Sequence, residues 1–146
     1  MKDFIASNYA LYRQWFEVSL DLIWKLPPSL RIRADPMAEI SKFEDISHAK
    51  AIKALTAGIK DTVSMTDRYS DHDLDSADKF FLAHGLPSLT SLRILFSKKM
   101  SKIISAGEIK TDEEYFMIKS LEDADIPENA IAQVRSLIGS YELKRK

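Results

Sequence analysis

Histidine and aspartate side chains at a few places along the chain are the residues best suited to metal chemistry. His48 comes first, the dipeptide His72-Asp73 follows, and Asp123 and Asp125 come later. Imidazole nitrogens and carboxylate oxygens bind divalent cations. These residues are therefore candidate metal ligands.

The order and rough spacing of His48, His72-Asp73 and a later Asp123 or Asp125 resemble those of the HD-type metal phosphohydrolases, an all-helical family. The resemblance implies a divalent metal held by these residues and hydrolysis of a phosphate. In that family the dipeptide normally ends an apolar helix, whereas here it lies in a polar, aspartate-rich run that reads as a helix start. Because acids favour the positive N-terminus of a helix, we expect the run to begin a helix, and we predict no metal and no cofactor.

The basic residues of the stretch 88–105 form a second set, whose chemistry would be phosphate binding. Arg93, Lys98, Lys99 and Lys102 fall in this stretch, which contains no acid. A predicted helix and Gly85 precede it, an order that resembles a helix-turn-helix, whose second helix enters the major groove of DNA. The positions four before and six after the glycine depart from that motif, so a solvated lysine face is the simpler interpretation.

The aromatic residues of the first predicted helix form a third set, suited to protein recognition. Tyrosine and tryptophan are enriched at the energetic centres of protein interfaces. Trp24 shares a helical sector with Arg13, and a helix used only for internal packing would not need a tryptophan there. We predict Tyr12, Arg13, Trp15 and Trp24 as partner-contact residues and expect Trp24→Ala to weaken association without lowering the thermal midpoint. Core packing of a long central helix is the alternative.

The composition is that of a folded domain without extreme charge. Of the 146 residues, 45% are hydrophobic and 29% are charged, and the formal net charge of −1 gives no global positive field that would attract nucleic acid or lipid. With 0 Cys the chain has no disulfide, which fits the reducing cytoplasm in which we expect it. Arg13, Glu17 and Asp21 interrupt the apolar N-terminal run, so we expect no membrane span and no signal peptide.

Helix signals recur along the whole chain. Apolar residues repeat with a period of about 3.6, and start and stop residues flank each stripe. Asp35-Pro36 is an N-cap followed by proline, Gly85 suits a left-handed helix end, and the run from Thr111 to Glu114 is a capping box. The predicted elements are a long aromatic helix at 1–26, an extended linker and possible boundary at 27–35, and helices at 36–43, 47–63, 71–84, 88–105, 112–121 and 126–141.

These signals predict an all-α protein, an irregular bundle of about six amphipathic helices in a single domain, residues 1–146. For function we favour a non-enzymatic module that binds another protein or a second copy of itself, for example as a regulator, an adaptor or an immunity-type inhibitor. A nucleic-acid-binding protein that uses the basic helix 88–105 is the alternative. An HD-like metal phosphohydrolase is the third possibility.

Overall fold

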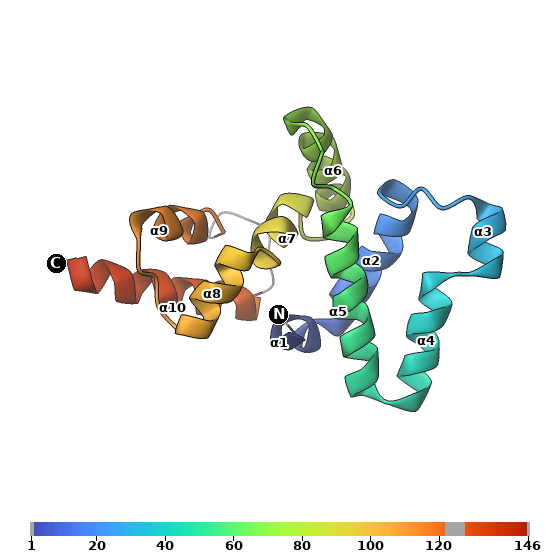
Figure 1. The fold of residues 1–146 in the computed structure, drawn as a ribbon, viewed down its shortest axis with the longest axis horizontal. Helices are drawn as coiled ribbons and strands as arrows, with labels where there is room; N and C mark the ends of the chain where they lie inside the picture. The colour runs from blue at the N-terminus through green and yellow to red at the C-terminus, as the bar shows by residue number, and fades with distance from the viewer. Residues whose placement is uncertain (1, 122–127, 146) are drawn as a thin grey trace. The chain divides into compact units, whose positions relative to one another are not determined.

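The computed structural model describes residues 2–121 and 128–145, with side chains placed in 5–121 and 132–144. Within these ranges the chain forms the helices α1 to α10 and no strand, so the predicted all-α class is confirmed (Figure 1). The predicted number of about six helices was too small. The first helix and the helix at 88–105 are each broken in two, and the expected linker is itself helical.

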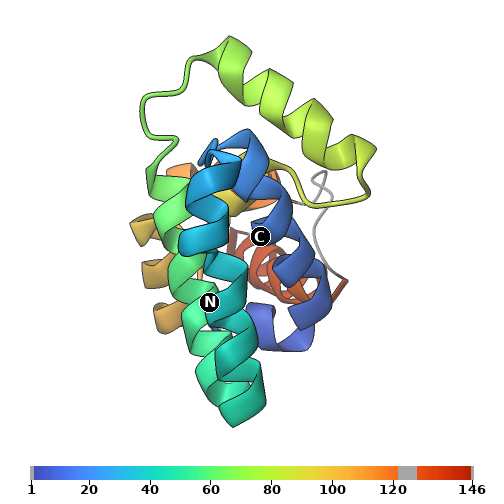
Figure 2. The same ribbon diagram turned by 90° about the vertical axis from the view of Figure 1, so that its right-hand side faces the viewer.

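The chain divides into two compact units, and unit 1 comprises residues 1–71. Its central helix is α5, which contacts α1, α2 and α4, and α4 and α5 lie side by side in both views (Figures 1 and 2). The helices of this unit are α1 (Lys2–Ser7), α2 (Tyr9–Leu22), α3 (Pro28–Arg33), α4 (Pro36–Ile46) and α5 (His48–Ser64).

The predicted caps of unit 1 form as expected. The Asp35 carboxylate accepts a hydrogen bond from the Met37 amide at 3.0 Å, with Pro36 in the first helical position of α4. Ser47 alone separates α4 from α5, and its hydroxyl oxygen accepts from the Lys50 amide at 3.4 Å. This one-residue connection turns the chain sharply, so that α5 packs beside α4.

Two predictions for unit 1 were wrong in detail. The first helix is interrupted at Asn8, whose φ of −136° and ψ of 44° lie outside the helical region. The segment expected to be extended instead forms α3, because Pro28 sits in the first helical turn and Arg31 pairs with Asp35 four residues later at 3.7 Å. None of the six residues of α3 is buried, so the alternation of apolar residues there does not reflect a buried face.

Unit 2 comprises residues 72–146 apart from those outside the described ranges. Within it α8 contacts α7 and α9, and α9 contacts α10. Its helices are α6 (Asp71–Ala83), α7 (Leu89–Leu95), α8 (Lys98–Ala106), α9 (Asp112–Lys119) and α10 (Glu128–Arg145). The predicted start of the last helix at Ile126-Pro127 lies outside the described residues.

Unit 2 also shows the predicted helix ends. Gly85 and Gly107 adopt left-handed φ values of 70° and 73°, a conformation that glycine reaches without a steric penalty. The Thr111 hydroxyl oxygen accepts from the Glu114 amide at 3.1 Å, as in a capping box, whereas the Glu114 carboxylate accepts from the amide of Lys110. In α6, Phe80 is 38% exposed beside the fully buried Phe81.

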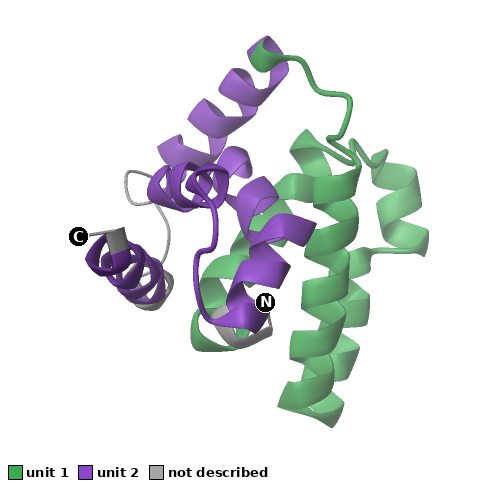
Figure 3. Ribbon diagram, turned by 60° about the vertical axis from the view of Figure 1, so that its left-hand side comes forward, with its two compact units in different colours: residues 1–71 green, residues 72–146 purple. Residues whose placement is uncertain are grey.

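The division between the units falls after Asp71, and the segment 27–35 lies inside unit 1 (Figure 3). The single domain of residues 1–146 stays a prediction. Among the described residues no helix combines the length and the apolar character that crossing a membrane requires.

Candidate protein-binding groove

Two of the four predicted contact residues are core residues of unit 1. Tyr12 is 1% exposed and Trp15 is fully buried. Burial raises the pKa of the Tyr12 hydroxyl well above its usual range, and that hydroxyl has no hydrogen-bond partner among the described residues. In this conformation neither ring is presented to a partner.

Arg13, the third predicted contact residue, holds α2 against α4. Its guanidinium donates from Nε to Glu44 Oε2 at 3.0 Å and from Nη2 to Glu44 Oε1 at 3.2 Å. The same Nη2 donates to Ser41 Oγ at 3.2 Å, and the Tyr9 hydroxyl donates to Glu44 at 2.8 Å. Arg13 therefore positions the face of α4 that turns toward α2.

The Arg13 cluster shifts the pKa values of its members. Burial would by itself raise the pKa of Glu44, but the hydrogen bonds from Arg13 and Tyr9 outweigh it and hold this pKa below its ordinary value. Burial, together with the hydrogen bond to Glu44, raises the pKa of Tyr9 to about 12. At neutral pH the cluster is thus an ion pair completed by a neutral phenol.

Trp24, the fourth predicted contact residue, is half-buried and is also engaged internally. Its Nε1 donates to Thr62 Oγ1 at 2.8 Å, and its ring meets Phe16 edge-on at 6.3 Å between centroids. Thr62 is fully buried in α5, so this hydrogen bond fixes the end of α2 on the central helix.

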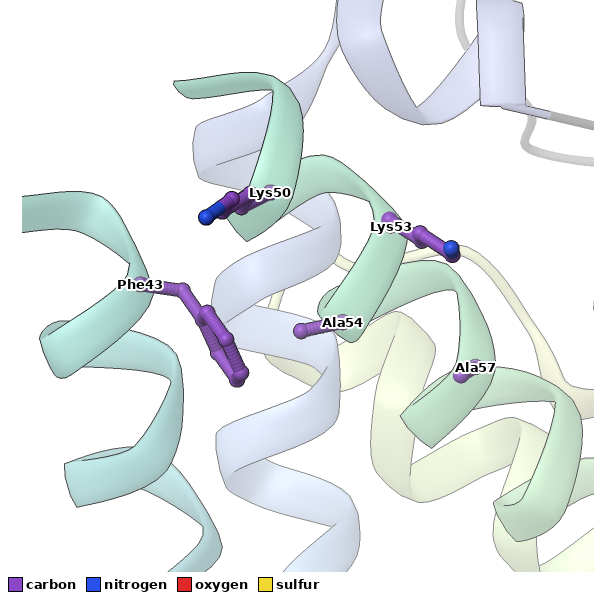
Figure 4. A pocket seen from close by; sticks show the side chains of 5 residues that line it. All are labelled: Phe43, Lys50, Lys53, Ala54 and Ala57. Atoms are coloured by element: carbon purple, nitrogen blue, oxygen red, sulfur yellow. The ribbon is translucent and has the colours of Figure 1, made fainter. Parts of the chain in front are cut away.

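A groove between α4 and α5 is a surface of unit 1 that could bind a partner. It has a volume of about 480 Å³ and is lined almost wholly by apolar atoms of Phe43, Lys50, Lys53, Ala54 and Ala57. Phe43 reaches from α4 toward Ala54 on α5, and the two lysines point away from each other (Figure 4). The result is an apolar floor with an ammonium group toward each side.

The sequence of α5 explains the groove. Ala51, Leu55 and Ile59 are fully buried and form the inward stripe of the helix. Ala54 and Ala57 lie beside that stripe, where methyl side chains are too short to fill the space next to Phe43. This site was not predicted. The alanines at i, i+3 opposite an aromatic residue are the sequence signal that could have identified it.

The surroundings of the groove are apolar and cationic. Ile46, three residues after Phe43 and so on the same side of α4, is 65% exposed. Lys50 and Lys53 are exposed and form no ion pair within the described residues. By contrast, the neighbouring carboxylate Glu44 is neutralised by Arg13 at 3.0 Å.

The basic residues of 88–105 do not share one helix. α7 ends at Leu95, and the Ser97 hydroxyl oxygen starts α8 by accepting from the Met100 amide at 3.1 Å. Arg93 therefore belongs to α7, whereas Lys98, Lys99 and Lys102 are exposed on α8, where Lys99 pairs with Glu113. The continuous recognition helix expected for a helix-turn-helix is absent from this part of the described chain.

The candidate metal ligands are not assembled in the described residues. His48 is the first residue of α5, with its ring edge-on to Tyr9 at 5.2 Å, while His72 and Asp73 lie in the first turn of α6 in the other unit. Asp123 and Asp125 lie outside the described residues. No group of three or more His, Asp or Glu side chains among those described is arranged to hold a metal ion.

Comparisons with protein-family models, with curated proteins and with solved structures find no match to this chain.

Proposed function

We propose that the protein is a non-enzymatic protein-binding module whose α4–α5 groove holds an acidic, amphipathic helix of another protein. The observation that supports this most strongly is the groove itself, about 480 Å³ of apolar space that carries lysines on its rim. Grooves between packed helices are a recurrent binding site for the apolar face of a partner helix.

The shape of the groove favours a helical segment as the occupant. A helix presents apolar side chains at i, i+3, i+4 and i+7, which suits a floor made of one aromatic ring and two methyl groups. The exposed Ile46 extends the apolar surface along α4 beyond Phe43. Burying this surface would supply most of the binding free energy.

The charges favour an acidic occupant. Lys50 and Lys53 are exposed ammonium groups at the rim, with no ion pair to compete for them within the described residues. Carboxylates that flank the apolar anchors of the partner would meet these two groups and would fix its register and increase its association rate. Arg13 and Trp24 act indirectly in this proposal, since they hold α4 and α2 on the rest of unit 1.

The test compares two double charge reversals, Lys50→Glu/Lys53→Glu and Lys98→Glu/Lys102→Glu, with the wild type. All four lysines are exposed, so we expect each double variant to keep its free energy of unfolding within about 0.5 kcal/mol of the wild type. Tagged proteins are used to purify partners from nuclease-treated lysate of the source organism. The bound segment of the recovered protein is then synthesised and its affinity is measured by calorimetry.

We expect the groove variant to bind that segment at least about tenfold more weakly and the α8 variant to bind it like the wild type. A segment that binds both variants equally would contradict the proposal. If partners are recovered only from lysate that has not been treated with nuclease, and the α8 variant recovers none, the result would support nucleic-acid binding instead.

A further inference from the structure

A second hollow, entirely within unit 2, has a different chemistry from the groove. It has a volume of about 330 Å³ and is lined by residues of α6, α7 and α9 and by Ser97. Its apolar walls come from Leu74, Ile94 and Met117. Thr90 and Ser97 line it as well, and Arg93 is the one charged residue among the described residues of the lining.

The neutral polar groups of this pocket already have their hydrogen bonds. The Thr90 amide and hydroxyl both donate to Asp78, with the amide at 2.9 Å. The Ser97 hydroxyl donates to the Ile94 carbonyl at 2.7 Å while its oxygen accepts from the Met100 amide. Neither residue has much capacity left for a ligand.

Arg93 differs from both. It is half-buried, and its guanidinium, which carries five N–H donors, makes no hydrogen bond or ion pair with any other described residue. A partly buried guanidinium beside apolar walls pairs most favourably with a carboxylate, which can accept two parallel hydrogen bonds.

We infer that this pocket binds a carboxylate that carries a short apolar chain. Arg93 binds the carboxylate group, and Leu74, Ile94 and Met117 contact the chain. A volume of about 330 Å³ suits a tail of several methylene groups and is at the small end of ligand pockets. The inference is independent of the proposed function, because the pocket and the groove lie in different units.

The probe is octanoate, titrated into the full ¹⁵N-labelled protein and followed by amide chemical shifts. Octanamide has the same tail without charge, and acetate has the charge without the tail. We expect octanoate to shift the amides of Thr90, Arg93 and Ile94 with a Kd at or below about 1 mM, and both controls to bind at least about tenfold more weakly.

Arg93→Gln is expected to weaken octanoate binding at least about tenfold, whereas Arg93→Lys, which keeps the charge, should lose less. Lys50→Glu/Lys53→Glu serves as the control variant and should bind octanoate like the wild type. Shifts that are confined to other residues, equal affinity for octanoate and octanamide, or an unchanged Kd in a folded Arg93→Gln variant would each overturn the inference.

Discussion

Single polar contacts hold the helices of unit 1 together at defined points. Trp24 illustrates this, because its indole Nε1 reaches the buried Thr62 at 2.8 Å and its ring covers Phe16. From the sequence, an aromatic residue in a helix is equally consistent with a place in an interface and a place in the core. Only the partners of each ring decide between the two, and the hydrogen-bond partner of Trp24, Thr62, lies 38 residues away in the chain.

We expect Trp24→Ala to lower the free energy of unfolding by about 2 kcal/mol, since it removes a half-buried ring and leaves Thr62 without one partner. Trp24→Phe, which keeps a ring but loses the N–H donor, should cost about 1 kcal/mol. Urea denaturation measures both values, with Ile32→Ala as a control at a site that is 87% exposed. A Trp24→Ala variant as stable as the wild type would contradict this structural role and would support Trp24 as a partner-contact residue.

The Arg13–Glu44 ion pair makes part of the stability depend on pH. Because the pKa of Glu44 is lowered in the folded state, its contribution is complete above the unfolded-state pKa of about 4.3 and is lost as the pH falls through the lower, folded-state value. The side chains of Arg13 and Glu44 are 31% and 29% exposed, so solvent screening limits the contribution to about 1 kcal/mol.

Glu44→Gln tests this pH dependence. The variant should be about 1 kcal/mol less stable than wild type at pH 7, and the difference should shrink as the pH falls below the unfolded-state pKa of about 4.3. Glu39→Gln is the matched control, because its pair with Lys42 is more than half exposed on both sides. A difference for Glu44→Gln that is constant across this pH range would show that ionisation of Glu44 does not stabilise the fold.

At the scale of whole helices, the packing of α2 on α5 depends on a glycine inside α5. A Cβ atom at Gly58 would lie 2.9 Å from Cζ and 3.0 Å from Cε1 of Phe16. Phe16 is 2% exposed and has Trp24 against its ring, so it has little room to move. Gly58 therefore sets how closely the two helices approach.

Gly58→Ala should destabilise the protein by about 1–2 kcal/mol, although alanine is the better helix former by about 1 kcal/mol. Gly139→Ala in α10, where a Cβ would meet nothing within 4 Å, should instead stabilise by about 0.5–1 kcal/mol. Combining Gly58→Ala with Phe16→Leu should recover part of the loss, which a double-mutant cycle would measure. Stabilisation by Gly58→Ala alone would contradict the close packing.

The sequence predicts helices better than helix breaks. Asp35, Ser47, Ser88 and Thr111 were recognisable as caps because a hydroxyl or carboxylate directly precedes each apolar stripe, and each accepts the expected amide hydrogen bond. Ser97 caps α8 in the same way but lies within a stripe that continues through Met100 and Ile103, so periodicity hid the break. The spacing of apolar residues along the sequence shows which face of a helix is buried. It does not show whether one helix ends and another begins in a new direction.

At the scale of the whole molecule, the chain divides into two compact units after Asp71, whereas the sequence offered a possible boundary at 27–35, which lies inside unit 1. Pro27 and Pro28 are the N-cap and the first residue of α3 inside unit 1, and α2 has already ended at Leu22. The α4–α5 groove was missed as well. It arises where two helices meet and depends on the small size of Ala54 and Ala57, and the spacing of these two alanines was its only sequence signal.

The most direct test of the groove as a binding site is site-specific photo-crosslinking. The photoreactive residue p-benzoylphenylalanine replaces Ile46, which is 65% exposed beside Phe43, or Ile32, which is 87% exposed on α3 as the matched control. We predict a crosslinked adduct with a partner from position 46 that is weak or missing from position 32. The adduct should disappear when Lys50→Glu/Lys53→Glu is introduced. The crosslinked partner peptide should be acidic, with apolar residues spaced as on one face of a helix. No adduct at position 46, or an adduct that persists in the charge-reversed variant, would contradict the account.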